Sequence, residues 1–315
     1  MSEPTPTLTV AVCTRGRPEQ VRATLDALDA GAPGVALLVV DQGPEPAAAL
    51  AERAAADGRL RVVHDSGRGL SRARNLALAA ARSEWIAFVD DDCLVAADFG
   101  AALLAEIAAH PTADWIAGDV RAGRGDRNFP PESRPYSGRN SSGSGGDVPP
   151  VTTFPVDRPL VRRGGRTLPG AIGFGVLFCV RRTTAERLGG WDERLGPGVP
   201  DLPAADDMDF NHRLLRSGGT AVLSPAVRAV HDQWRSPDEV VELQRGYSRA
   251  WAGFACKHLA RNAGGGLRLW AWGLVDVLDM AASATRRRSP LRARIALAKL
   301  RGLLEGTALG LRRRW

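Results

Sequence analysis

The first hundred residues alternate continuous apolar runs with segments of helical periodicity, and this pattern constrains the fold more than any other feature. The apolar runs, which we interpret as strands, are residues 8–13, 36–40, 60–64 and 85–89. Helices are expected between them at residues 20–29, 47–56 and 71–81, where apolar side chains recur every three or four positions. Apolar strands separated by helices are typical of a parallel sheet covered on both faces. The sequence therefore predicts an α/β fold.

Carboxylates follow two of these expected strands. Asp41 ends the second run, and Asp90, Asp91 and Asp92 end the fourth. Open parallel sheets bind ligands beyond the carboxyl ends of their strands, so both positions are candidate site positions. Three adjacent carboxylates repel one another, and a divalent cation would offset that repulsion. The alternative is a solvated acidic loop ahead of the next helix.

Four motifs, taken in chain order, resemble the family 2 glycosyltransferases of the GT-A fold. The segment SRARNLA at 71–77 precedes an apolar strand that ends in Asp90-x-Asp92, and GGWDERL follows at 189–195. The segment DDMDFNHR at 206–213 is similar to the family's E-D-x-[DE]-[LF]-x-x-R, with Asp206 in place of the usual Glu. The strand ends at 14–18 (TRGRP) and 37–43 (LLVVDQG) also look like the family's, although Gln42 and Pro44 depart from its common form.

The resemblance implies a nucleotide-binding, Rossmann-like, mostly parallel sheet flanked by helices, and an inverting sugar transfer assisted by Mn²⁺ or Mg²⁺. It makes Asp207 the general base that accepts a proton from the attacking hydroxyl. Asp206 and Trp191 would bind the acceptor, and Asp92 and His231 would hold the metal. The donor would be bound by Thr14, Arg15, Asp41, Arg74, Asp90 and Asp91.

Each of these assignments has a structural alternative. Asp207 could be an acidic residue favoured at a helix N-terminus, and Arg74 could be a solvated helical arginine. His231 could be a structural histidine beside an apolar strand. Asp209 and Arg213 stand at i and i+4, and a surface ion pair is at least as good an interpretation as a site role.

The rest of the chain divides into a loop and a helical extension. Residues 121–166 are rich in Gly, Ser, Pro and Arg, so a long mobile loop is expected there. We expect a catalytic domain at 1–235 and a C-terminal helical extension at 236–315, with Ser236 or Asp238 capping its first helix.

Basic charge is concentrated in the tail. Residues 283–315 carry a net charge of +9, whereas the whole chain carries +7, so the remainder is slightly acidic. A nucleic-acid-binding core is therefore not expected. Arginines beside the leucines of an apolar helical stripe favour binding to an anionic membrane surface, which would suit a lipid-linked acceptor. Trp270 and Trp272 could reinforce this binding as interfacial anchors, and core packing is the equal alternative for them. The alternative is a helix packed on the body with solvated arginines.

Cysteine spacing and hydropathy bear on the compartment. Cys13, Cys93, Cys179 and Cys256 form no CxxC pair, so buried reduced thiols are expected. No secretory leader or membrane span is visible, which favours a cytoplasmic protein, peripheral at the inner face of the membrane. The predicted function is transfer from a UDP- or dTDP-linked sugar to a glycan or lipid-linked acceptor in cell-envelope polysaccharide or glycolipid synthesis. A sugar-phosphate nucleotidyltransferase and a non-catalytic nucleotide-sugar-binding module remain the alternatives.

Overall fold

The computed structural model describes residues 7–123, 153–164, 167–232 and 236–315. The amino-terminal part follows the predicted alternation. Its elements are β1 (Leu8–Thr14), α1 (Pro18–Gly31), β2 (Ala36–Asp41), α2 (Ala48–Ala56), β3 (Leu60–His64), α3 (Leu70–Ala80), β4 (Trp85–Asp90), β5 (Cys93–Val95), α4 (Phe99–Ala109) and β6 (Trp115–Gly123).

The later elements complete the sheet and add a helical segment. Those that belong to the sheet region are β7 (Leu160–Arg163), the short 3₁₀ helix η1 (Pro169–Ile172), β8 (Leu177–Arg181), α5 (Arg182–Arg187), α6 (Asp206–Arg216) and β9 (Thr220–Asp232). Three long helices follow: α7 (Pro237–Leu259), α8 (Ala263–Arg287) and α9 (Pro290–Arg312).

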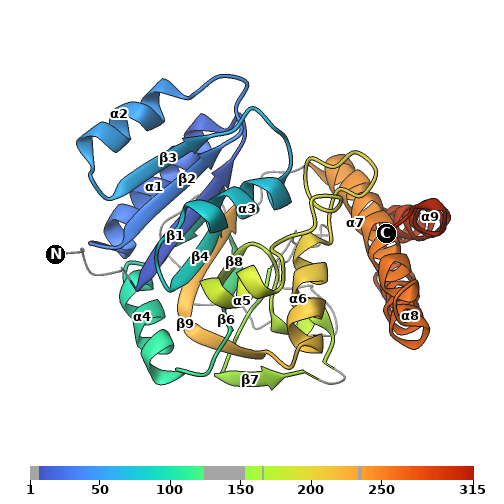
Figure 1. Ribbon diagram of the computed structural model, residues 1–315. Coiled ribbons are helices and arrows are strands. Elements are labelled where there is room, and N and C mark those ends of the chain that lie inside the picture. Colours follow the sequence, from blue (N-terminus) through green and yellow to red (C-terminus); the bar gives the residue numbers. More distant parts are fainter. Residues whose placement is uncertain (1–6, 124–152, 165–166, 233–235) are drawn as a thin grey trace. The chain divides into compact units, whose positions relative to one another are not determined.

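Within the described residues the strands form one mixed sheet of nine, in the order β3-β2-β1-β4-β8-β6-β9-β5, with β7 paired to β9 (Figure 1). The predicted parallel arrangement holds for β3, β2, β1 and β4. β8 then enters antiparallel between β4 and β6, and β6 pairs in parallel with β9. The carboxyl ends of β1, β2 and β4 therefore share one edge of the sheet, and their acidic and polar residues meet there.

Helices cover both faces of the sheet, as the apolar strands require (Figure 1). Along β1, Val10 and Val12 face a core built with α1, α2 and α4, whereas Ala11 faces a second core built with α3, α5 and α6. Strand residues alternate between the two cores because successive side chains point to opposite faces. This explains why the central strands β1, β2 and β4 lack the regular alternation of apolar and polar residues that a half-exposed strand would show.

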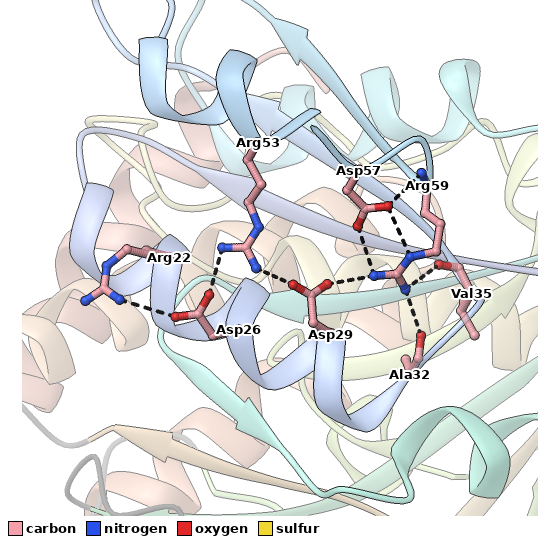
Figure 2. Close-up of polar contacts among 8 residues, drawn as sticks. All are labelled: Arg22, Asp26, Asp29, Ala32, Val35, Arg53, Asp57 and Arg59. Atoms are coloured by element: carbon pink, nitrogen blue, oxygen red, sulfur yellow. Dashed lines mark hydrogen bonds and ion pairs between the residues drawn. The ribbon is translucent and has the colours of Figure 1, made fainter. Parts of the chain in front are cut away.

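A network of arginines and aspartates ties α1 to α2 and to the start of β3 (Figure 2). Arg53 on α2 donates to Asp26 at 2.8 Å and to Asp29 at 2.5 Å, both on α1. Arg59 donates to Asp29 and Asp57, and also to the backbone carbonyls of Ala32 and Val35 in the turn between α1 and β2. Asp29 is shared by Arg53 and Arg59, and Asp26 by Arg53 and Arg22, so the network fixes α1 and α2 relative to the start of β3.

The expected loop at 121–166 is only partly a loop. Residues 121–123 continue β6, Phe154 bridges to Val120, and Leu160–Arg163 form strand β7. The expectation of an unstructured segment is therefore wrong for these positions, because they gain backbone hydrogen bonds from β6 and β9 that the local sequence does not reveal. Residues 124–152 of the expected loop lie outside the described residues.

The chain forms two compact units. The first holds the sheet and its helices, and the second gathers residues 192–206 with the three C-terminal helices. Ser236 begins α7 with a reciprocal capping box to Glu239, as predicted for that helix start. None of the helices within the described ranges has the length and apolarity needed to cross a bilayer.

The second unit is held by close helix packing and a buried ion pair. Gly302, Gly306 and Gly310 lie on one side of α9, and a Cβ on Gly306 would stand 2.0 Å from the carbonyl oxygen of Arg249 on α7. The absent side chains let the two backbones approach closely. Lys257 on α7 donates to Asp192 at 2.7 Å, and both side chains are almost fully buried.

Candidate active site

The acidic cluster lies at the end of β4 beside the end of β1. Thr14 donates its hydroxyl to Asp91 at 2.7 Å, and Arg17 donates to Asp91 at 2.9 Å. Thr24 on α1 donates to the backbone carbonyl of Asp91 at 2.9 Å. Burial raises the pKa of Asp91, while Arg17 and Thr14 act in the opposite direction. The turn after β4 is thus held by groups from β1 and α1.

Asp92 and His231 are brought together by the pairing of β5 with β9. Cys93 stands opposite His231 in that ladder, and His231 Nε2 lies 3.2 Å from Asp92 Oδ1. Arg17 approaches the other oxygen of Asp92 at 3.3 Å. Ligand atoms of Asp92, Cys93 and His231 all lie within 4.8 Å of one another. Two side chains that are 139 residues apart in the sequence therefore lie together in one buried polar cluster.

The donor set fits a hard or borderline divalent cation. A carboxylate oxygen and an imidazole nitrogen are both ligands that manganese accepts, and magnesium accepts the carboxylate. Burial and the neighbouring carboxylates raise the pKa of Cys93 well above its ordinary value. A neutral thiol is a poor ligand for Mg²⁺ or Mn²⁺. Asp92 and His231 are the residues that would hold the ion.

Asp90 occupies the last position of β4 and faces Arg74 on α3. The nearest nitrogen of Arg74 lies 3.8 Å from an Asp90 oxygen, and the Arg74 side chain is 2% exposed. Desolvation, together with the neighbouring carboxylates Asp92 and Asp91, raises the pKa of Asp90 to about 7, against the opposing effect of Arg74. A bound cation would lower it, because positive charge favours the ionised carboxylate.

Gly175 connects Arg74 to Asp207. Arg74 donates to the carbonyl oxygen of Gly175 at 2.7 Å, and the N–H of Gly175 donates to Asp207 Oδ2 at 2.8 Å. The N–H of Asp90 donates to the next residue, Val176. A Cβ on Gly175 would lie 2.7 Å from the Arg74 guanidinium, so the position requires glycine for this contact. The acidic cluster and the expected base therefore meet at one edge of the sheet.

Asp207 is partly exposed, and its neighbour Asp206 is buried. Asp207 Oδ1 accepts from the backbone N–H of Met208 at 2.7 Å, which fixes the carboxylate at the start of α6. Asp206 is 4% exposed and packs beside Gly196. Ala205, the residue before, has φ of +67°, a left-handed conformation that a non-glycine residue adopts at a cost. The chain is thus sharply turned where it delivers the two carboxylates.

The ring of Trp191 is part of the core. It is 2% exposed and stacks on Phe210 with centroids 4.6 Å apart, and it meets Phe88 edge-on at 5.1 Å. The expectation that this side chain contacts an acceptor is corrected, since a ring buried among aromatic residues presents no face to a ligand. Asn75 exchanges two hydrogen bonds with the backbone of Trp191, at 2.8 and 2.9 Å.

Asp41 and its neighbour order the loop beyond β2. The Asp41 carboxylate accepts from the N–H groups of Gly43 and Ala47, and Asp41 is 3% exposed. Gln42, which departs from the family pattern, donates to Asp65 at 2.8 Å and accepts from the N–H of Gly69. Gln42 therefore ties the end of β2 to the loop that leads into α3.

Asp209 and Arg213 form an ion pair, but not on the surface. Asp209 is completely buried, and it accepts from Arg213 at 2.8 Å. Arg213 also donates to the carbonyls of Leu188 and Gly190, just before Trp191. The surface interpretation is wrong, because α6 packs this side against the GGW segment rather than toward solvent. The pair positions that segment.

Two residues with structural roles at or near the site, Arg17 and Asn75, were not predicted from the sequence. Arg17 lies in the TRGRP turn and bonds two carboxylates of the cluster, whereas the predicted donor-binding Arg15 is exposed two residues earlier. Asn75 directly follows Arg74 and holds the segment at Trp191. Arg17 lies in the TRGRP motif and Asn75 in the SRARNLA motif, so membership of a motif was the signal that could have identified them. A motif does not specify where each side chain points. The four cysteines are free thiols, as predicted.

Comparisons with known structures agree on the fold. A mannosyltransferase from Pyrobaculum calidifontis, in complex with GDP-Man and Mn²⁺, superposes with a TM-score of 0.60 at 18% identity over 98% of this chain and 87% of that one. GalNAc-T7 with UDP, GalNAc and Mn²⁺ gives 0.54 at 16% identity, over 84% of this chain and 52% of that one. Residues 1–349 of TarS from S. aureus give 0.50 at 14% identity, over 96% and 90%. These similarities show a GT-A glycosyltransferase fold.

Sequence comparisons identify the family. A segment of 57 residues is 46% identical to the uncharacterized glycosyltransferase EpsJ of Bacillus subtilis (strain 168), a match that spans 18% of this chain and 17% of that protein. The family model for glycosyl transferase family 2 matches residues 9–175, just over half of the chain. This match does not support the nucleotidyltransferase alternative. With a GT-A sheet whose acidic strand ends meet in one site, the chain belongs to glycosyl transferase family 2.

Proposed function

We propose that this chain is an inverting glycosyltransferase that moves a sugar from a nucleoside-diphosphate donor to a hydroxyl group of an acceptor. The observation that carries the proposal is the continuous path from Asp207 through Gly175 and Arg74 to Asp90. It joins the expected base to the acidic cluster, although the two lie more than a hundred residues apart. A non-catalytic binding module would have no need for both.

On the acceptor side, Asp207 is the residue that takes the proton. Its carboxylate is partly exposed and accepts two backbone hydrogen bonds, so its orientation is fixed while a lone pair remains for a hydroxyl. A fixed carboxylate that removes the proton as the oxygen attacks is a general base. Direct attack by that oxygen, with departure of the diphosphate from the opposite face, inverts the anomeric centre. Asp206 would position the acceptor or Asp207.

On the donor side, Asp92 and His231 would hold Mn²⁺ or Mg²⁺, which when bound stabilises the negative charge on a departing diphosphate. Arg17 and Arg74 bring positive charge to the same edge and would bind phosphate oxygens or neutralise the cluster. Thr14 and Asp91, which are hydrogen-bonded to each other, and the exposed Arg15 would line the donor site with them. Asp41 would bind the base.

The identities of the donor nucleotide and of the acceptor are narrower proposals. UDP- and dTDP-linked sugars are expected from the sequence. The structural neighbours hold GDP-Man in one complex and UDP in another, so GDP is included in the test. The acceptor we propose is a glycan or a lipid-linked glycan of the cell envelope, reached from the cytoplasmic side.

The test is a thermal-shift screen of the full chain with UDP, dTDP and GDP, each with and without MnCl₂ or MgCl₂. We expect one nucleotide to raise the Tm only when metal is present, because a ligand at a hundred times its Kd stabilises the folded state by about 2.7 kcal/mol. The matching nucleotide sugar should then be hydrolysed in a metal-dependent reaction. Absence of stabilisation by every nucleotide with either metal would contradict the proposal.

A further inference from the structure

The C-terminal helices expose an unusual share of large apolar side chains. Among the described residues, ten large hydrophobic side chains are exposed by 37% or more, and eight of them lie on α8 and α9. These eight are Leu267, Trp272, Val275, Leu278, Leu297, Leu300, Leu304 and Leu311. Single exposed leucines are ordinary, but a concentration on two neighbouring helices marks an interaction surface.

On α9 the exposed leucines form one stripe. Leu297, Leu300, Leu304 and Leu311 follow spacings of three, four and seven, which keeps them on one side of a helix. The opposite side carries Gly302, Gly306 and Gly310, which lie against α7. Leu303 and Thr307, which lie between the two sides, contact α8.

On α8 the exposed residues likewise point away from α7. Leu267, Val275 and Leu278 fall on one side of the helix, with Trp272 at its flank. Gly273 and Leu269 face Trp251 of α7, and Trp251 donates to the carbonyl of Leu269 at 2.7 Å. The exposed apolar residues of α8 therefore lie on the side that the bundle leaves open.

The two stripes lie on the same side of the bundle. α8 packs on the second half of α9 through Val277 against Leu303 and a 2.8 Å hydrogen bond from Trp270 to Thr307. On each helix these contact residues stand between the α7-facing side and the exposed stripe. Both exposed stripes consequently lie along the line of contact between α8 and α9, on the side of the bundle opposite α7. We call the eight exposed residues the α8–α9 face.

Positive charge surrounds this face. Residues 263–315 contain eleven Lys and Arg against three Asp and Glu. Two of the acids already have basic partners, Asp276 with Lys299 and Glu305 with Arg245 of α7. Arg286, Arg287 and Arg288 are exposed where α8 ends, and Arg301, Arg312 and Arg314 are exposed along and after α9. The surface therefore carries exposed arginines at both ends and at Arg301, with one further exposed acid, Asp279, on α8.

We propose that the α8–α9 face docks on an anionic lipid bilayer, lying in the interface rather than crossing it. The leucines, Val275 and Trp272 would enter the boundary between headgroups and acyl chains, and the exposed arginines would contact lipid phosphates. Apolar burial and attraction to anionic lipid together give the binding strength of such surfaces. Charge complementarity selects lipid over a second copy of this chain, because two copies would bring their arginines together.

This surface differs from the stripe that the sequence suggests. Ile295 and Leu303 are completely or almost completely buried in the bundle, and Arg292 and Lys299 are also buried. These residues pack within the helical bundle, and Arg292 is buried rather than solvated as the packed-helix alternative supposed. The surface available to lipid consists of the outer leucines of α9 together with α8, and it does not depend on the sugar-transfer chemistry.

The experiment is flotation of the full chain with vesicles of phosphatidylcholine alone or mixed with phosphatidylglycerol. The test variants are a triple Leu297→Ser, Leu300→Ser, Leu304→Ser and a triple Arg286→Gln, Arg287→Gln, Arg288→Gln. Matched controls on the first unit are Leu104→Ser and the triple Arg22→Gln, Arg61→Gln, Arg187→Gln. All of these side chains are exposed, so the variants should fold, which circular dichroism checks.

We expect the wild-type chain to bind only the anionic vesicles, and each test variant to lose binding by about tenfold or more. The controls should bind like the wild type. Three outcomes overturn the proposal: no binding by the wild-type chain, equal binding by the leucine variant, or equal binding to neutral vesicles. A fourth is concentration-dependent self-association that the leucine variant abolishes while vesicle binding is unchanged, which would assign the face to a second copy.

Discussion

The backbone N–H of Gly175 donates to Oδ2 of Asp207 at 2.8 Å, and this bond orients the carboxylate that we propose as the base. The carbonyl of the same residue accepts from Arg74, so one glycine holds a group on each side of the site. The bond works only with an acceptor at Oδ2. A substitution at residue 207 that keeps an oxygen for this bond can therefore separate the proton-accepting role of the carboxylate from its structural role.

Asp207→Asn should reduce sugar transfer by a factor of about 100 to 10,000 while nucleotide binding with metal is retained. The amide keeps one oxygen acceptor but loses the basic site, and the lost hydrogen bond costs only about 1 kcal/mol. The measurement is turnover beside metal-dependent thermal shift. Asp98→Asn, at a carboxylate exposed by 59%, is the control and should behave like the wild type. Unchanged turnover of the Asp207 variant would contradict the assignment.

Arg17→Gln should lower the metal-free Tm and enlarge the rise in Tm caused by MnCl₂. Arg17 is the cation that faces Asp91 and Asp92, so its removal leaves these buried carboxylates to repel each other at a cost of about 2 kcal/mol. A divalent ion would compensate for part of that loss. Arg15→Gln, in the same turn but exposed, should change neither quantity. An identical manganese response in Arg17→Gln and the wild type would show that the two cations do not share a site.

Asp65→Asn should flatten the acid side of the stability profile. Hydrogen bonds from Arg72, together with one from Gln42, lower the pKa of Asp65 from 3.8 to about 2. A lowered pKa means that the stabilisation is present above about pH 4 and is lost as the pH falls toward 2. Urea midpoints across this range should therefore fall less in the variant than in the wild type. Asp238→Asn, at an acid exposed by 80%, should reproduce the wild-type slope.

Lys257→Met should destabilise the second unit by about 3 kcal/mol, measured by chemical unfolding. Lys257 and Asp192 have side chains exposed by only 3% and 10%, so the variant leaves a buried carboxylate without this partner. Lys299→Met is the matched control, because its partner Asp276 is exposed by 58% and can be solvated. That variant should lose about 1 kcal/mol or less. Equal losses would mean that burial does not decide the strength of these pairs.

Gly306→Ala should separate α9 from α7 and cost about 1–3 kcal/mol, even though alanine favours helices. Its Cβ would stand 2.0 Å from the backbone carbonyl of Arg249, which cannot move without moving α7. Gly264→Ala adds the same group where the nearest atom is 3.8 Å away, so it should be neutral or slightly stabilising. A neutral Gly306→Ala would show that the two helices are not closely packed.

Several site positions could be predicted from the sequence because they follow strands. Asp41 and Asp90 stand where apolar runs end, and parallel strands bring those ends to one edge. A helix N-terminus at Asp207 was one interpretation of the sequence, and α6 begins beside it at Asp206. The strand at Leu160–Arg163 was missed because it gains its stability from pairing with β9, which no local pattern encodes.

Side-chain direction was less predictable than position. Trp191 was expected at the acceptor, yet its ring stacks on Phe210 in the core, and Asn75 holds only its backbone. Arg17 was passed over, although it contacts two carboxylates. A motif specifies which residues are needed, while packing decides which of them face the ligand and which support it.

The sequence by itself determined the α/β class, the acidic strand ends and the helical C-terminal segment, because strand, helix and turn preferences act over a few neighbouring residues. Only the tertiary structure decided that His231 meets Asp92, that Gly175 joins Asp207 to Arg74, and which leucines of α9 remain exposed. Those contacts join residues far apart along the chain or on different helices. They form only when the strand order and the packing of helices bring the backbones together.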